Sequence, residues 1–101
     1  MQVPMDEERR QRMVQLLEAN HHFPGPYHLS LVTINDVAVV MILRALVEEG
    51  GRPVLDADWE TRLSSGGKYA SHRVRVICDT AHEVIAIYDR VWGTPGLVSL
   101  L

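Results

Sequence analysis

Two alternating segments joined by a glycine-containing turn constrain the fold of this chain more than any other feature of its sequence. Between Leu55 and Leu63 every second residue is charged, and residues 68–78 set valines against arginines in the same way. A period of two is typical of half-buried β-strands, whose successive side chains point to opposite faces. Residues 64–67 supply turn chemistry between the two segments. The pattern predicts an antiparallel hairpin.

The alternation also assigns the side chains of this hairpin to two faces. One face is predicted to hold Ala57, Trp59, Thr61 and Leu63 of the first strand, with Val74, Val76 and Cys78 of the second. The opposite face is predicted to hold Asp56, Asp58, Glu60 and Arg62, with Arg73 and Arg75. In an antiparallel sheet the apolar face lines the core and the charged face meets solvent.

Caps, turns and apolar periodicity predict the remaining elements. The second helix is apolar nearly all round, which means that it must be covered on more than one side. In order, the expected elements are a helix from its cap Asp6 to about Glu18, a strand over residues 27–34, a helix from Asn35 or Asp36 to about Glu49, the two hairpin strands, a helix opened by the capping box Thr80–Glu83, and a strand over residues 97–101.

This order, a helix followed by β-α-β-β-α-β, predicts an α+β, ferredoxin-like sandwich. Right-handed crossovers place the first and third strands in the middle of a four-stranded antiparallel sheet, with two helices on one face. The other face is left open, and we expect functional contacts there. We assign residues 1–22 to an N-terminal helix and linker, and residues 23–101 to the ferredoxin-like domain.

Composition narrows the classes of partner and compartment. The chain has 101 residues, enough for one domain with its own core, and 10 basic against 13 acidic residues. A net charge of −3 gives no attraction to nucleic acid or to an anionic membrane. A single cysteine cannot form an intrachain disulfide, and the longest apolar run is too short to span a membrane. We expect a cytoplasmic protein.

The histidines and the cysteine raise the question of a metal site or a nucleophile. His21, His22 and His28 lie close in sequence, and Cys78 and His82 are four apart. Zinc needs three or four ligands that converge at about 2.0–2.3 Å, whereas adjacent loop histidines point in different directions. Cys78 shares the core face of its strand, where a thiol packs as a small apolar group. Loop histidines and a structural cysteine are the preferred interpretation.

Three carboxylates are a second candidate for chemistry. The spacing of Asp56, Asp58 and Glu60 would place them about 7 Å apart in a row, which could suit acid–base catalysis. The same face carries Arg62, so a solvated face of mixed charge is the preferred interpretation. We expect no enzyme activity, no catalytic residue, no metal and no cofactor.

Several motifs are spread over most of the chain. They are Leu16-Leu17-Glu18, Phe23-Pro24-Gly25-Pro26-Tyr27, the distinctive turn Ser64-Ser65-Gly66-Gly67-Lys68-Tyr69-Ala70-Ser71, Val84 with Ile87-Tyr88, and the C-terminal Leu101. Together these motifs resemble the YbeD-like family of small bacterial proteins of unknown function. The resemblance implies a βαββαβ fold similar to the regulatory ACT domains of amino-acid metabolism, and it brings no catalytic residue. In that comparison Asn35 and Asp36, at the first strand-to-helix turn, either bind a ligand or only cap the helix.

The signature turn is expected to be ordered. Ser64, Ser65 and Ser71 offer hydroxyls to nearby backbone groups, and Tyr69 offers a ring to pack beside them. Gly66 and Gly67 are expected to include at least one residue with a positive φ.

Two functions of different class are compatible with the sequence. The first is a non-catalytic interaction or regulatory module, and the alternative is an ACT-like sensor of an amino acid or related acid. For the first we expect a partner protein or a homodimer. The contact would use the apolar second helix or the open sheet face, where Glu60 would meet Arg73 or Arg75 across a two-fold axis. Arg62 belongs to the same surface.

The second helix needs a cover for its remaining apolar flank. Either the N-terminal helix supplies it, through Met13, Leu16 and Leu17, or a second copy of the chain does.

Overall fold

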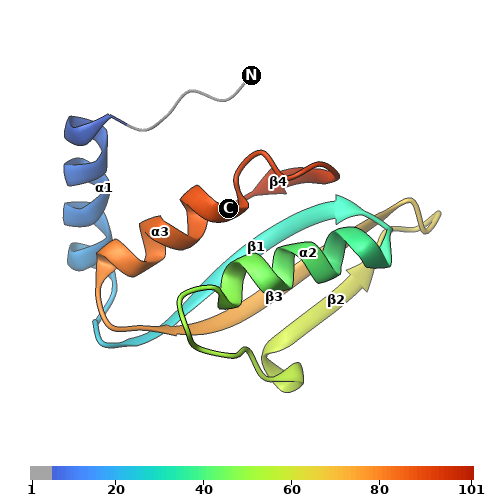
Figure 1. Ribbon diagram of the computed structural model, residues 1–101, viewed down its shortest axis with the longest axis horizontal. Coiled ribbons are helices and arrows are strands. Elements are labelled where there is room, and N and C mark those ends of the chain that lie inside the picture. Colours follow the sequence, from blue (N-terminus) through green and yellow to red (C-terminus); the bar gives the residue numbers. More distant parts are fainter. Residues whose placement is uncertain (1–5) are drawn as a thin grey trace.

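A four-stranded antiparallel sheet forms the framework of the protein (Figure 1). The structure is a computed structural model that describes residues 6–101. The strand order is β2-β3-β1-β4, so the first and third strands lie in the middle as predicted. The elements are α1 (Glu7–Asn20), β1 (Gly25–Ile34), α2 (Val37–Glu48), the 3-10 turn η1 (Asp56–Asp58), β2 (Trp59–Leu63), β3 (Tyr69–Cys78), α3 (Ala81–Val91) and β4 (Leu97–Leu100).

The predicted hairpin is confirmed in its antiparallel pairing. Trp59 lies opposite Val74 and Leu63 opposite Ala70 across β2 and β3. Along β3 the side chains alternate strictly between exposed and buried. β1 pairs with β3 over its whole length and with the short β4 on its other side.

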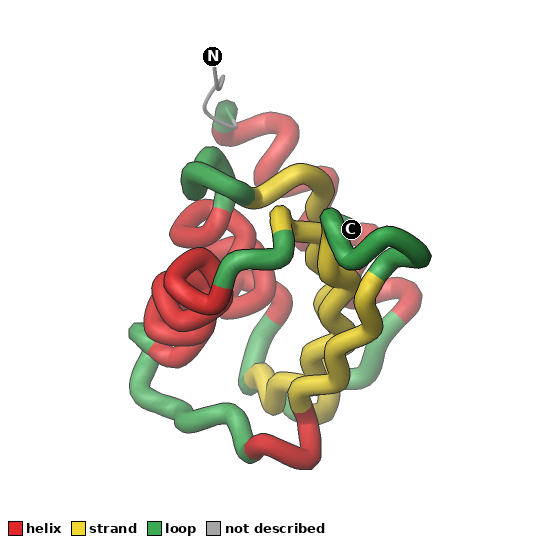
Figure 2. Tube along the Cα trace, turned by 90° about the vertical axis from the view of Figure 1, so that its right-hand side faces the viewer, coloured by secondary structure: helices red, strands yellow, loops and turns green. Residues whose placement is uncertain are grey.

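Helices α2 and α3 lie on one face of the sheet, and the other face is open (Figure 2). Each helix begins at a side-chain cap. Asp36 accepts a hydrogen bond from the Ala38 amide at 2.8 Å, and Thr80 accepts one from the Glu83 amide at 3.3 Å. These caps satisfy amides that the helix cannot pair internally. The core between helices and sheet contains Leu29, Leu31, Leu43, Val74, Val84, Ile85 and Val91, all fully buried.

The N-terminal helix packs on α3 and does not cover α2. Its buried residues are Val14 and Leu17, and the Arg10 guanidinium lies 3.0 Å from the Asp89 carboxylate of α3. The alternative in which α1 covers α2 through Met13, Leu16 and Leu17 is wrong, because α1 packs on α3 and the Met13 and Leu16 side chains are exposed. Residues three or four apart lie on the same side of a helix, so Arg10, Val14 and Leu17 share the side of α1 that packs on α3.

The predicted first hairpin strand is too long at its start. Residues 56–58 form a 3-10 turn in which the Asp58 amide donates to the Leu55 carbonyl at 2.9 Å, and β2 begins only at Trp59. The turn is tied to α2 because Asp56 pairs with Arg44 at 2.9 Å. The alternation of charge therefore continues through a segment that is not extended.

Within residues 6–101, no helix has the length and apolar character needed to cross a membrane.

Candidate functional site

The outer face of α2 is apolar and exposed. Leu43 and Val47 point into the core. On the parts of the helix that do not face the core, Val37 is 74% exposed, Met41 67% and Ile42 53%. A surface helix normally carries polar residues on these parts. Exposed apolar patches rimmed by polar residues mark interaction sites in globular proteins.

One side of this helix lies above β2. The Arg44 guanidinium lies 5.8 Å from the centroid of the Trp59 ring, at the start of β2. Met41 and Val37 precede Arg44 by three and seven residues, which places them on the same side of the helix. Since α2 and β2 run in opposite directions (Figure 1), these two residues lie toward the end of β2, where Leu63 is 54% exposed. We call Val37, Met41 and Leu63 the β2-edge strip.

A second feature is a cleft of about 440 Å³ between the C-terminal end of α2, the loop that follows it, β3 and α3. Val47, Val54 and Ile87 are among the apolar residues that line it. The charged lining residues are Arg52, Arg75 and Arg90 with Asp58 and Glu83. Small-molecule sites commonly have volumes of about 300–1,000 Å³ and combine an apolar lining with few polar groups. The cleft therefore has the size and lining of a small-ligand site.

Two arginines of the cleft, Arg52 and Arg90, donate hydrogen bonds to backbone carbonyls. Arg90 donates to the Leu46 carbonyl at 2.7 Å and to the Val47 carbonyl at 3.2 Å, at the end of α2. Arg52 donates to the Ile77 carbonyl at 2.9 Å. These contacts join α2 to α3 and the following loop to β3. A cation is favourable beside the last carbonyls of a helix.

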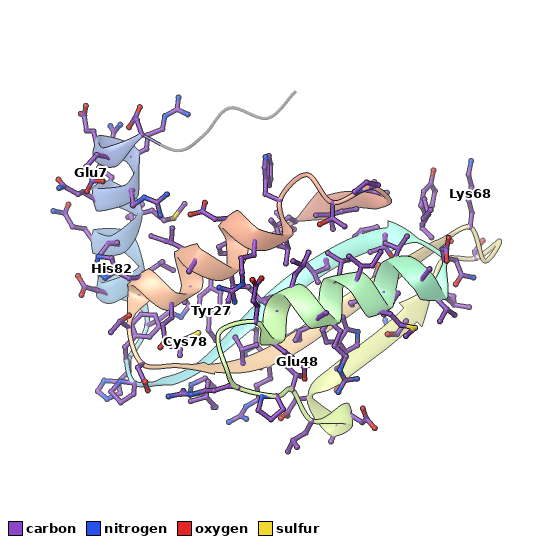
Figure 3. The ribbon with its side chains drawn as sticks, viewed as in Figure 1. Glu7, Tyr27, Glu48, Lys68, Cys78 and His82 are labelled. Atoms are coloured by element: carbon purple, nitrogen blue, oxygen red, sulfur yellow. The ribbon has the colours of Figure 1, made fainter. Side chains whose placement is uncertain are left out.

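Glu48 holds the other wall of the cleft. Its carboxylate projects from α2 toward the following loop (Figure 3) and accepts a hydrogen bond from the Val54 amide at 2.6 Å. The Arg44 guanidinium donates to the carbonyl of Val54. Val54 is buried by these contacts, so the loop has a defined position over the cleft.

Cys78 lies at the floor of this cleft, near the start of α3 (Figure 3). The side chain is buried, and burial, with Glu83 nearby, raises the pKa of the thiol to about 11. A thiol with this pKa is protonated at neutral pH and is a poor nucleophile.

His72 is the centre of a buried polar network that the sequence analysis did not single out. It is only 2% exposed and lies on the core face of β3. Trp59 donates to its Nδ1 at 3.2 Å, and the Thr61 hydroxyl lies 2.9 Å from the same atom. Because Nδ1 accepts from Trp59, the ring proton lies on Nε2, 3.0 Å from the Thr33 hydroxyl. Burial lowers the pKa of His72 below its ordinary value.

Asn35 and Asp36, the predicted ligand-binding pair, both make hydrogen bonds within the chain. The Asn35 amide donates to the Gly67 carbonyl at 2.8 Å, which ties the end of β1 to the signature turn. Asp36 is the N-cap of α2. They lie at the opposite end of α2 from the cleft, and ligand binding by this pair stays a prediction.

The signature turn is ordered as expected. The Ser64 hydroxyl accepts from the Tyr69 amide at 3.0 Å, and the Gly67 amide donates to the Ser64 carbonyl at 2.9 Å. Gly67 has a φ of +73°, a conformation that favours glycine, so the predicted positive φ is confirmed at this residue. Lys68 lies over the Tyr69 ring, 5.5 Å from its centroid. Ser65, Gly66 and Ser71 belong to the same exposed hairpin end.

The open sheet face carries the four predicted contact residues Glu60, Arg62, Arg73 and Arg75. Glu60 lies opposite Arg73 on the neighbouring strand of the same chain, and Arg62 lies opposite Ser71. Arg75 lies opposite His28, and its guanidinium is 3.9 Å from the Asp58 carboxylate.

The expected row of three carboxylates is wrong at Asp56, which belongs to the 3-10 turn and pairs with Arg44. Asp58 also lies in the 3-10 turn, but it is near Arg75 and lines a small pocket of the open face together with Glu60. In the part of the chain from Asp6 onward, no group of three His, Cys, Asp or Glu side chains could hold a metal ion. The His21 ring instead packs against Tyr27, with ring centroids 4.9 Å apart.

Comparison with known proteins gives a family and no role. A family model described as a protein of unknown function, DUF493, matches residues 18–101. The chain belongs to the DUF493 family. This is the YbeD-like family that the signature turn and the flanking motifs indicated. The DUF493 match begins within α1 and covers the whole sheet with α2 and α3. No curated protein and no solved structure matches the chain significantly.

The features that the sequence analysis missed are His72 and the cleft. A signal for His72 was available, because it shares the alternation of Val74 and Val76 on the core face of β3. The cleft offers no such signal, since its walls come from four separate elements.

Proposed function

We propose that this DUF493 protein is a non-catalytic interaction module that works through contact with another protein. The exposed apolar face of α2 carries the proposal. Val37, Met41 and Ile42 project from a helix whose opposite side is already buried in the core. Burying such side chains in an interface is favourable by about 25 cal/mol per Å² of apolar surface. Methionine adapts its shape to a partner surface, which suits Met41 to the centre of the contact.

An affinity experiment tests this function. The protein is immobilised and exposed to an extract of the cells that produce it, and retained proteins are identified by mass spectrometry. We expect Met41→Asp to reduce recovery of the specific partner about tenfold or more, because a buried unpaired charge costs more than about 1.4 kcal/mol. Leu16→Asp is the matched control, since Leu16 is also an exposed apolar helix residue but lies on α1.

Two results would contradict the proposal. One is an unchanged set of retained proteins with Met41→Asp, and the other is an equal loss with Leu16→Asp. A second copy of the chain counts as a partner in this experiment.

A sensor of small acids is the second candidate, and the cleft favours it. Its volume of about 440 Å³ and its apolar lining have the size and character of a site for an amino acid or a related carboxylate. Arg52 and Arg90 line it and would exchange their present partners Asp79 and Glu49 for the ligand carboxylate. A ligand of this class would raise the melting temperature in proportion to RT ln(1 + [L]/Kd). Ala86→Leu, which fills the cleft from α3, should abolish the shift, whereas Ser99→Ala on β4 should leave it. No shift with any amino acid or short carboxylate would reject this second function.

A further inference from the structure

β2 presents an open backbone edge. It is the end strand of the sheet, with β3 on one side and no other strand beyond it among residues 6–101. The Ser64 amide donates to the Tyr69 carbonyl at 2.9 Å, so Ser64 and Tyr69 form a hydrogen-bonded pair at the turn end of the ladder between β2 and β3. Since bonded and non-bonded pairs alternate in antiparallel strands, the backbone groups of Glu60 and Arg62 face β3. Those of Trp59, Thr61 and Leu63 therefore face away from the sheet.

The sequence of β2 is complementary to itself. Reading from Trp59 to Leu63, an aromatic residue, an acid, a threonine, a base and a leucine follow one another. When this strand is paired antiparallel with a second copy about Thr61, Glu60 lies opposite Arg62 of the other copy. Trp59 likewise lies opposite Leu63. Opposite charges and apolar pairs facing each other across strands stabilise the pairing.

The same pairing uses the outward backbone groups. With Thr61 opposite Thr61, each threonine donates its amide to the carbonyl of its counterpart, as a hydrogen-bonded antiparallel pair requires. Glu60 and Arg62 then form the non-hydrogen-bonded pairs, in which side chains approach more closely. The outward direction of the Thr61 backbone groups and the complementarity of the side chains are independent observations. Both favour the register in which Thr61 lies opposite Thr61 of the other copy.

The β2-edge strip lies beside this edge on the helix side. Val37, Met41 and Leu63 are exposed in one copy. Because Leu63 lies opposite Trp59 of the other copy, a two-fold axis at Thr61 places this strip beside the Trp59 end of the other copy's edge. Strand pairing and apolar burial would thus occur in one interface.

The other edge of the sheet lacks these features. β4 contains Leu97, Val98, Ser99 and Leu100, with no charged residue to pair. Its register against β1 shifts between Val32 and Thr33. Irregular, short edge strands resist pairing with another chain.

We propose that two copies of this chain associate through β2, antiparallel about a two-fold axis at Thr61, which joins two four-stranded sheets into one continuous sheet. This inference rests on the proposed function, since it names a second copy as a partner of the apolar α2 surface. The surface it assigns is the β2 edge with its apolar strip, and the charged pair across the axis is Glu60 with Arg62.

Sedimentation equilibrium on charge-exchanged variants tests the pairing. The intact protein at micromolar concentration is expected to sediment with twice its chain mass of 11.4 kDa. Arg62→Glu and Glu60→Arg each place like charges opposite one another twice, and each should raise the dimer dissociation constant about tenfold. Mixing the two variants should restore association, because each then meets opposite charges. The double exchange Glu60→Arg/Arg62→Glu should also be dimeric.

Ser99→Glu on β4 is the matched control and should leave the dimer intact. Circular dichroism shows whether each variant is folded, and the mixture and the double exchange report on pairing even if one single variant is unstable. A monomeric intact protein overturns the pairing, as do dimeric single variants or a mixture that fails to associate. If the intact protein is a monomer, the affinity experiment still decides the proposed function. A different protein that is retained by the intact chain and lost with Met41→Asp would support that function.

Discussion

The two helices that cover the sheet differ in what lies on their outer sides. α3 buries Val84, Ile85 and Val91 toward the core, and its other side is covered in part by α1 through the Arg10–Asp89 ion pair. α2 buries a similar stripe, but its outer side exposes Met41 and other apolar residues to solvent. The comparison shows that the protein supplies a cover for α3 from its own chain and none, among the described residues, for α2.

Substitution on the core side of α2 is expected to cause the largest loss of stability. Leu43 is fully buried, so Leu43→Ala should lower the free energy of unfolding by about 3 kcal/mol. Ile42→Ala, one residue along on the outer side, should cost about 0.5 kcal/mol or less. Urea denaturation followed by circular dichroism measures both. Similar losses for the two variants would show that the outer side of α2 is covered within the chain.

The cover of α3 gives a smaller effect. Leu17 of α1 is buried against the rest of the protein, and Leu17→Ala should destabilise by about 2 kcal/mol. Leu16→Ala on the exposed side of the same helix is the control, with an expected change of about 0.5 kcal/mol or less. If Leu17→Ala is as mild as its control, α1 is not the cover of α3 and the contrast between the helices is lost.

His72 in the sheet is expected to make the free energy of unfolding depend on pH, with a smaller effect than the core substitutions. His72 beside β2 has a lowered pKa, so the unfolded chain binds its proton first as the pH falls. The free energy of unfolding should decrease below about pH 6.5, by up to about 1.4 kcal/mol per pH unit from this residue. His72→Gln should flatten the dependence. An unchanged slope between pH 5 and 7 in His72→Gln would contradict the role of the network.

Under alkaline conditions the free energy of unfolding should depend on Cys78. The raised pKa of Cys78 favours its neutral form in the folded state. Its contribution to stability is therefore present below the pKa of an unfolded thiol, about 8.5, and is lost as the pH rises toward 11. These two residues of β3 are thus expected to lower the free energy of unfolding at opposite ends of the pH range.

Local patterns predicted most of the fold. The alternation around residues 64–67 indicated the hairpin, and the caps Asp6, Asp36 and Thr80 are all observed at the expected helix starts. The 3-10 turn at residues 56–58 escaped prediction because apolar and acidic residues continue to alternate through it.

Tertiary placement was less accessible from sequence. The side of α1 that is buried depends on which helix it meets, and a short stripe near Leu17 does not distinguish α3 from α2. The cleft likewise depends on how α2, its following loop, β3 and α3 come together. The self-complementary order of charges in β2 acquires meaning only when β2 is known to be an edge strand.

Photo-crosslinking from the outer side of α2 tests the central claim most directly. A photoreactive amino acid replaces Met41 in the full chain, within the cells that produce the protein, and a second variant carries it in place of Leu16 on α1. We expect a specific crosslinked product from position 41, either to another protein or to a second copy, and none of that product from position 16. No crosslinked protein from position 41, or the same products from both positions, would contradict the assignment of this helix face as the contact surface.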